Sequence, residues 1–117
     1  MSKHEDTPYL KHILDAINDI QESTKNLSKK EFEISKDPKD ATIRRIEIIG
    51  EAIKNISKEL KEKYPAILWK KIAGARDRMI HAYFSIDLDI LWDIAKKDLP
   101  ILKKQIQKIQ QDLEKND

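Results

Sequence analysis

Apolar residues recur along this chain at intervals of three and four, the spacing of one face of an α-helix. The first such stretch begins where Thr7 can cap a helix that has Pro8 at its first position. It continues to Leu27. The pattern therefore predicts a long N-terminal helix, whose apolar face is formed by Leu10, Ile13, Leu14, Ile17 and Ile20.

The next segment, residues 28–37, is mostly polar, and we expect a short turn of helix or a loop there. Asp37 and Pro38 then repeat the signal of a cap followed by proline. Gly50 lies inside the second long helix that this signal predicts. Since an interior glycine costs about 1 kcal/mol relative to alanine, we expect another helix to approach closely there. The apolar face of this helix is formed by Ile43, Ile46, Ile49, Ile53, Ile56 and Leu60.

The dipeptide Tyr64-Pro65 interrupts the helical pattern, because a residue before proline disfavours helical geometry. A third helix is expected to begin near Pro65 and to extend as far as Tyr83. Within it, Trp69 follows the helical spacing of the apolar residues that face the core, and Trp92 does the same further along the chain. Both tryptophans are therefore expected to serve packing.

Asp87 can cap a fourth helix, whose apolar spacing continues from Ile90 to Leu113. Pro100 lies inside this pattern and should kink or split the helix near residues 97–99. No repeat and no linker divides the chain, so residues 1–117 are expected to form one domain. The predicted fold is an all-α, up-down bundle of four to five helices. Long helices in so short a chain favour a two-fold dimer.

The composition narrows the classes of protein that fit. The chain has no cysteine, which excludes disulfides, thiol chemistry and cysteine-based zinc sites. Charged residues make up 38% of the chain, yet the net charge is only +2. This balance does not indicate a protein that coats nucleic acid, although it allows a local basic patch. No apolar run approaches the roughly 20 residues that span a bilayer, so a cytoplasmic protein without membrane contact is expected.

The stretch from Arg76 to Tyr83 concentrates charged, imidazole and phenol groups in eight residues. On an ideal helix Arg76 and Tyr83 share one face, and Asp77 and His81 share another. Arg76 and His81 are separated by about 140° on such a helix. One straight helix therefore cannot direct both at one atom. Either the helix bends or ends near His81, or the two groups converge across a subunit interface.

These side chains suit the cleavage of RNA. The planar guanidinium of Arg76 matches two phosphate oxygens, and His81 can carry a proton near neutral pH. The 2′-hydroxyl of RNA is an internal nucleophile, so a base and a cation would suffice without a metal. The leaving oxygen also needs a proton. A dimer that places two His81 side chains in one cleft would supply a second proton carrier.

The string from Arg76 through His81 to Tyr83, RDRMIHAY, matches the R-x-x-x-x-H-x-Y pattern of HEPN ribonucleases. The chain resembles the HepT branch in particular, through "RRIEIIGEAIKNIS" (residues 44–57) and "YPAILWKKIAGARDRMIHAYFSID" (residues 64–87). The resemblance implies an all-helical dimer that cuts RNA, either tRNA or mRNA, without metal or cofactor. It also implies that Arg76 and His81 line a cleft between two copies.

The resemblance further implies a toxin of a type VII-like toxin–antitoxin system. The partner is then an MntA-type minimal nucleotidyltransferase antitoxin, which transfers AMP from ATP to the motif tyrosine, here Tyr83. The added anion would occupy the phosphate site beside Arg76 and repel RNA. The dimer could also assemble with the antitoxin into a hetero-oligomer. Many family members carry Asn after the motif arginine, whereas this chain carries Asp77, which could orient His81 or lower the positive potential.

Several residues keep two interpretations. Arg78 is a supporting residue that either contacts RNA or lies on an ordinary charged surface. Lys70 and Lys71 either form a basic approach to RNA or belong to a solvated face balanced by Glu59 and Glu62.

Two other residues are interpreted mainly through their place in the fold. Asp87 is most simply a helix cap, and support of catalysis is its secondary interpretation. His12 lies off the apolar face and is expected to be solvated.

Two other functions remain open from the residues alone. The chain could be a non-catalytic helical partner of a nucleotidyltransferase, which the acidic Asp77 beside Arg76 favours. It could also be a structural dimer module that binds no ligand.

Overall fold

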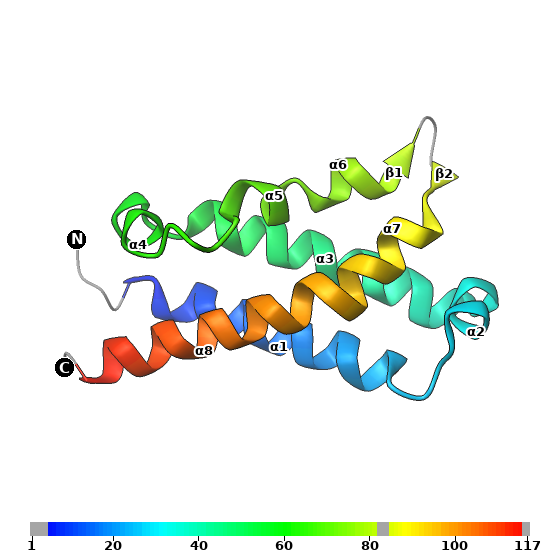
Figure 1. Ribbon diagram of the computed structural model, residues 1–117, viewed down its shortest axis with the longest axis horizontal. Helices are drawn as coiled ribbons and strands as arrows, with labels where there is room; N and C mark the ends of the chain where they lie inside the picture. Colours follow the sequence, from blue (N-terminus) through cyan, green and yellow to red (C-terminus); the bar gives the residue numbers. More distant parts are fainter. Residues whose placement is uncertain (1–4, 82–84, 116–117) are drawn as a thin grey trace.

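The protein is an elongated helical bundle, shown as a computed structural model in Figure 1. The structure describes residues 5–81 and 85–115, with the backbone alone for residues 80, 81 and 85. Three long helices give the bundle its shape: α1 (Thr7–Thr24), α3 (Lys36–Asn55) and α8 (Leu99–Lys115). α1 runs antiparallel to both α3 and α8 (Figure 1). The expected all-α, up-down architecture is confirmed.

Shorter elements connect the long helices, so the described residues contain more helices than the four to five expected. The shorter elements are α2 (Lys29–Ile34), α4 (Lys58–Lys63), α5 (Trp69–Ala73), α6 (Ala75–Met79), β1 (Ile80–His81), β2 (Ser85–Ile86), α7 (Leu88–Asp93) and the π-helical turn η2 (Ile94–Asp98). The additional helices are α2, α4, which carries the Leu60 expected on the second long helix, and a pair, α5 and α6, in place of one long third helix.

The core is formed where α1 packs against α3 on one side and α8 on the other. Burying one such aliphatic side chain contributes about 1.5–3 kcal/mol, so the predicted apolar faces account for the packing of these helices. Trp69 is buried, and Trp92 stacks at a tilt on Phe32 with 5.3 Å between ring centroids, which confirms their packing roles. The fully buried side chains include Leu10, Ile13, Ile17, Ile20, Ile49, Ile53, Leu102 and Ile106.

The N-terminal helix begins at Thr7, one residue before the expected first position at Pro8, and its cap residue is Asp6. The prediction of Thr7 as cap was therefore wrong, because Thr7 itself is part of the helix. The buried Asp6 carboxylate makes no capping bond to its own helix. It accepts hydrogen bonds from both the backbone amide and the hydroxyl of Ser57, each 2.7 Å long. Ser57 in turn caps α4 by accepting from the amide of Leu60.

The polar segment after α1 forms the short helix α2. Ser28 and Glu31 build a capping box, in which each side chain accepts a hydrogen bond from the backbone of the other. α3 then begins at Lys36 with Ser35 as cap, two residues earlier than the predicted signal at Asp37. The proline that follows Asp37 lies within the first turn, where a missing amide hydrogen costs no helical bond.

The third helix differs most from the expectation. It begins at Trp69 rather than near Pro65 and ends at Ala73, where Gly74 donates its amide to the carbonyls of Lys70 and Ile72. A second short helix, α6, ends at Met79. The chain then enters a two-residue antiparallel ladder, β1–β2, in which Ile80 pairs with Ile86 and His81 with Ser85. The Asp87 amide donates to the Met79 carbonyl over 2.7 Å and closes this ladder.

The predictions for the C-terminal helix are confirmed. Asp87 caps α7 by accepting from the amide of Ile90 over 3.0 Å. The helix is divided by η2 just before Pro100. There the Leu99 amide donates to the Ile94 carbonyl, five residues back, in the geometry of a π-turn. Proline, which lacks an amide hydrogen, is accommodated by this local change.

Among the described residues, no helix combines the length and the apolarity needed to cross a membrane.

Candidate active site

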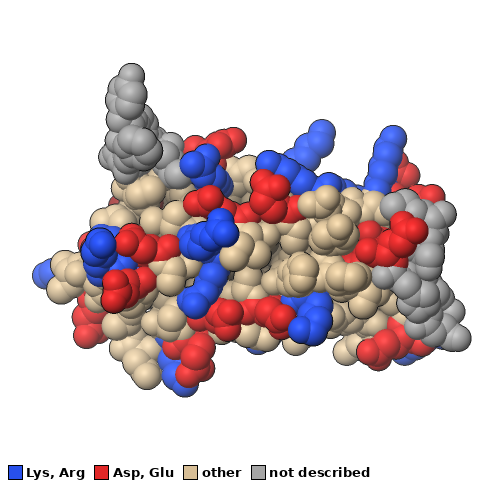
Figure 2. All heavy atoms as spheres, turned by 180° about the vertical axis from the view of Figure 1, so that it is seen from behind, with Lys and Arg blue, Asp and Glu red and all other residues tan. Residues whose placement is uncertain are grey.

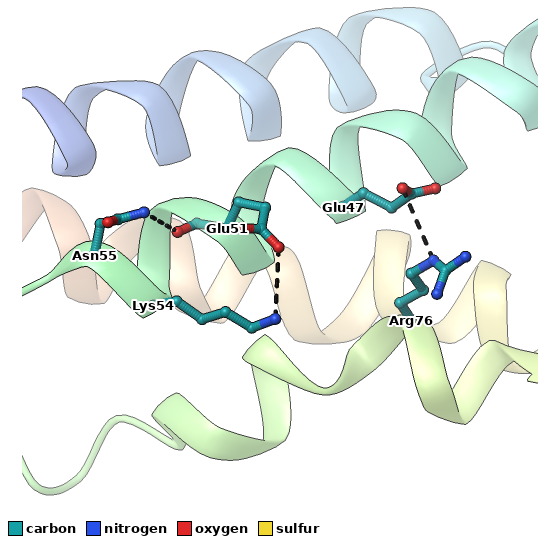
Figure 3. Close-up of polar contacts among 5 residues, drawn as sticks. All are labelled: Glu47, Glu51, Lys54, Asn55 and Arg76. Carbon is teal, nitrogen blue, oxygen red and sulfur yellow. Dashed lines mark hydrogen bonds and ion pairs between the residues drawn. The ribbon is translucent and has the colours of Figure 1, made fainter.

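Arg76 extends from α6 toward α3, where Glu47 faces it (Figure 3). The Nε of Arg76 lies 3.8 Å from Oε2 of Glu47. The Arg76 side chain is 58% exposed, and no other ion pair or hydrogen bond engages its guanidinium within the described residues. Its two terminal nitrogens are therefore available to an anionic ligand.

A close approach of two backbones allows this contact. A Cβ atom added at Gly50 of α3 would lie 3.1 Å from the carbonyl oxygen of Ala73, at the end of α5. A side chain here would push α5 and α6 away from α3 and carry Arg76 away from Glu47. The packing role expected for Gly50 is confirmed.

A groove of about 530 Å³ runs along the exposed face of α3. α1 contributes Tyr9 and His12 to its wall, and the α5–α6 segment contributes Arg76 and Asp77. His12 is exposed, as expected, and its ring meets Tyr9 edge-on with 6.3 Å between centroids. Sequence reasoning did not connect these aromatic residues with the motif. Their separation of three residues on α1, which places them on neighbouring positions of the helix, was the only available signal.

The groove carries both signs of charge. On the helical turn after Glu47, the carboxylate of Glu51 lies 3.5 Å from Nζ of Lys54, as Figure 3 shows. Arg44 also lines the groove, and Asp77 is exposed at its edge. Figure 2 shows this mixture of basic and acidic side chains on the face seen from behind. The groove is therefore not a uniformly positive channel, because both basic and acidic side chains surround Arg76.

Arg78 lies against a different neighbour. Its terminal nitrogen is 3.4 Å from Oδ2 of Asp98 in η2, and the two side chains are about two-thirds buried. Its Nε is buried and has no hydrogen-bond partner among the described residues. Two residues of the motif thus point to different places, Arg76 to the groove and Arg78 to the packing between α6 and η2. The contact with Asp98 favours a structural role for Arg78.

The end of α6 at Met79 changes the geometry expected for the motif. His81 lies on β1, not on a helix, so Asp77 and His81 do not share a helical face. Of the two alternatives left open for the motif, the structure shows a helix that ends close to His81, and convergence across a subunit interface stays a prediction. Tyr83 and the side chain of His81 lie outside the described residues, and the roles expected of them stay predictions.

The side chains of the described residues include no cluster of three or more His, Cys, Asp or Glu arranged to hold a metal ion. Among the described residues, the largest shift in pKa is that of Tyr64, which lies away from the groove. Burial, followed by a 2.7 Å hydrogen bond donated to Asp112, raises the pKa of Tyr64 to about 12. The same bond lowers the pKa of Asp112.

Comparison with known proteins agrees with the motif. The family described as "Ribonuclease HepT-like" matches residues 13–109. A protein of Methanocaldococcus jannaschii, named "Gamma-glutamylcyclotransferase and putative RNase", is 52% identical over 108 residues, 92% of this chain. This chain spans 49% of that relative's length. No solved structure matches the chain.

Two further relatives match over nearly their whole length. One, from the same organism and named "Putative RNase", is 43% identical over 117 residues, which is all of this chain and 97% of the relative. The "Probable ribonuclease HepT" of Thermococcus cleftensis is 43% identical over 101 residues, covering 86% of this chain and 92% of the relative. The chain therefore belongs to the HepT-like ribonucleases, a family of enzymes that cleave RNA.

Proposed function

We propose that the protein is a metal-independent endoribonuclease in which Arg76 and His81 act on one phosphodiester. The observation that carries the proposal is the position of Arg76, an exposed cation held at Nε by Glu47 with its terminal nitrogens uncontacted among the described residues. A guanidinium held in this way presents a fork to two phosphate oxygens. The end of the helix at Met79 supports the pairing with His81, because the fixed separation of 140° on an ideal helix no longer applies.

The proposed reaction uses the 2′-hydroxyl of the RNA as nucleophile. The imidazole of His81 takes the hydroxyl proton while the bond from O2′ to phosphorus forms. Arg76 stabilises the negative charge that collects on the phosphorane oxygens. The bond from phosphorus to O5′ then breaks, and the leaving oxygen receives a proton. The products are a 2′,3′-cyclic phosphate and a free 5′-hydroxyl.

A homodimer would complete this site, because the reaction uses a base and then an acid. His81 of one copy would act as the base, and His81 of the second copy would supply the proton to O5′. Residues 1–117 serve as a single domain in this scheme, and the enzyme acts on tRNA or mRNA in the cytoplasm.

We further propose that the enzyme is the toxin of a toxin–antitoxin pair. Its partner is an MntA-type nucleotidyltransferase that transfers AMP to Tyr83, which lies outside the described residues. Tyr83 is two residues beyond His81, so the added phosphate would lie close to the motif and compete with RNA for Arg76.

The test is cleavage of purified tRNA and mRNA by the wild type, Arg76→Ala and His81→Ala. Loss of an oxyanion-stabilising cation or of a proton carrier lowers the rate by about 10²- to 10⁴-fold. Arg44→Ala is the matched control, since Arg44 lines the same groove without an ion pair among the described residues. Equal cleavage by all four proteins would show that the motif is not the catalytic site.

A second candidate function is non-catalytic binding of a nucleotidyltransferase. The acidic side chains of Glu47, Glu51 and Asp77 in the groove favour it, because they lower the positive potential that RNA requires. A tight complex, without RNA cleavage and unaffected by His81→Ala, would support this function over the first.

A further inference from the structure

The lysines of this chain differ in how their charge is compensated. Most described lysines contact a carboxylate or another oxygen acceptor, as Lys11, Lys25 and Lys36 do through ion pairs with residues three or four positions away. Five lysines make no ion pair and no hydrogen bond within the described residues and lie near one another. We call these five the lysine surface: Lys61, Lys63, Lys70, Lys71 and Lys104.

Three adjoining hollows place the lysine surface on one side of the molecule. One hollow is bordered by lysines of α4 and α5, and another by lysines of α4 and α8. The third lies between them, and the segment 65–68 contributes to all three. In Figure 1, α4, α5 and α6 form one edge of the molecule. Figure 2 shows basic side chains projecting from that upper edge.

Acidic residues of α4 make no direct contact with the lysine surface. From the sequence, Glu59 and Glu62 were one possible source of charge balance for Lys70 and Lys71. Glu62 instead pairs with Lys58, 3.8 Å away, and Glu59 forms no ion pair among the described residues. Any balance by these two acids therefore acts through the general charge of α4 and not through ion pairs with Lys70 or Lys71.

The lysine surface continues toward the motif. Lys70 and Lys71 lie on α5, and α6, which carries Arg76, follows α5 directly after Gly74. In Figure 1 the two helices succeed one another along the same edge as α4. An extended strand whose phosphate is held by Arg76 could therefore run along α5 and α4.

We propose that the lysine surface binds the phosphate backbone of the RNA strand that flanks the scissile phosphate. This inference rests on the proposed function, since it extends the same site. Lysine is a flexible point charge that binds phosphates without a demand for geometry, and unpaired cations release counterions when they meet a polyanion. A second copy of the chain would bring like charge against like charge and is disfavoured.

An acidic protein is the alternative polyanion. Leu68 and Ile101, 59% and 60% exposed, lie on the middle hollow and could be covered by such a protein. However, lysine is depleted in protein interfaces, because each ammonium group must be desolvated or paired individually. Five uncompensated lysines therefore favour a phosphate backbone, which remains hydrated and supplies a charge at every nucleotide.

The test measures binding of a single-stranded RNA whose 2′-hydroxyl groups are methylated, so that no internal nucleophile exists and binding is separated from cleavage. The triple variant Lys63→Gln, Lys70→Gln, Lys71→Gln is compared with the wild type over a range of salt concentrations. Each lost phosphate contact lowers the slope of log K against log salt by about 0.7 on single strands. We expect the slope to fall by about 2, and the affinity at low salt to fall at least tenfold.

The control is the triple variant Lys11→Gln, Lys25→Gln, Lys36→Gln, which changes the net charge equally but removes lysines that are already paired with acids. It should keep at least two-thirds of the wild-type slope and bind RNA within about threefold of the wild type. Thermal melts of both triple variants verify that the fold is intact.

An unchanged slope in the first triple variant, or an equal loss in both, would overturn the inference. Polyglutamate serves as an acidic polypeptide probe. If the first triple variant loses polyglutamate binding but keeps RNA binding, the surface serves an acidic protein and the proposal is wrong. A protein that binds RNA through these lysines yet never cleaves it would keep the inference and refute the proposed function.

Discussion

Arg76 and Glu47 are joined through only one nitrogen of the guanidinium, with 3.8 Å between Nε and Oε2. The carboxylate comes from α3 and the guanidinium from α6, so the pair also links the two helices that border the groove. At this distance the pair is an electrostatic contact and not a hydrogen bond; it favours a position of the guanidinium beside Glu47 and leaves its terminal nitrogens to a ligand. Glu47 is thus placed to act as a positioning residue for Arg76.

Replacing Glu47 with Gln should lower kcat for RNA cleavage about two- to fivefold. A partly exposed pair of this kind is typically worth up to about 1 kcal/mol. KM should stay the same or fall, because the groove loses a negative charge. Steady-state kinetics on a defined RNA would show this split.

Glu51→Gln is the matched control for that variant, since Glu51 lines the same groove one turn further along α3 but contacts Lys54 instead. It should leave kcat unchanged. In an Arg76→Ala background, Glu47→Gln should have no further effect on kcat. A similar kcat loss in both Gln variants would show that Glu47 acts only through the general charge of the groove.

Tyr83 should accept AMP when the protein is incubated with ATP and an MntA-type nucleotidyltransferase. Intact-mass spectrometry should then show the mass of one AMP group on the wild type and none on Tyr83→Phe. RNA cleavage should fall in step with the labelled fraction, because the new phosphate competes for Arg76. Equal labelling of both proteins would place the modification elsewhere.

Cleavage should continue when divalent metals are chelated, and it should stop when the 2′-hydroxyl beside the scissile phosphate is replaced by hydrogen. Both expectations follow from a mechanism in which the RNA supplies its own nucleophile. A gel assay with EDTA and with a single 2′-deoxy substitution measures them. Full activity on the 2′-deoxy substrate would point to an external water as nucleophile.

Asp6→Ala should lower the free energy of unfolding by about 2 kcal/mol, because the amide and hydroxyl of the half-buried Ser57 lose their acceptor. Thr7→Ala is the control, since the neighbouring Thr7 is exposed and was the cap that the sequence predicted. It should change the stability by less than about 0.5 kcal/mol. Urea unfolding of both variants gives the comparison, and the reverse order would contradict the structure.

The phenol of Tyr64 should make the fold sensitive to alkaline pH. Its pKa is raised from 10.0 to about 12 in the folded protein by burial and by the bond to Asp112. The unfolded chain therefore releases this proton first, and the stability that the neutral phenol contributes is complete below pH 10. It is lost as the pH rises from 10 to about 12. In urea titrations at several pH values, Tyr64→Phe should lack this loss, and a parallel decline in both proteins would assign it to another group.

Local sequence signals predicted the long helices well because their apolar faces follow a single period. Leu10, Ile13 and Ile17 are buried as their spacing requires, and Gly50 marks a real close approach. The position of the α1 cap was missed because the partner of Asp6 lies 51 residues away. Such a contact has no trace in the neighbouring sequence.

The residue types of the candidate site could be predicted from the sequence, but the backbone geometry that positions them could not. The types and spacing of Arg76 and His81 pointed to phosphodiester chemistry, but helical periodicity continued past Met79, where the helix ends. Gly74 separates α5 from α6, and the ladder that pairs Ile80 with Ile86 follows the end of α6, a pairing that a window of local sequence does not show. The contact with Glu47 was missed for the same reason, because it joins two helices distant in the chain.

The bond between Asp6 and Ser57 gives one backbone amide an unusual property. The first amides of a helix have no carbonyl of their own helix to bind, and they ordinarily exchange hydrogen with water rapidly. The amide of Ser57 is instead held by a carboxylate at the start of α1. Its rate of deuterium uptake therefore reports how often the beginning of α1 separates from α4, and a single resolved amide signal can follow the opening of this end of the bundle.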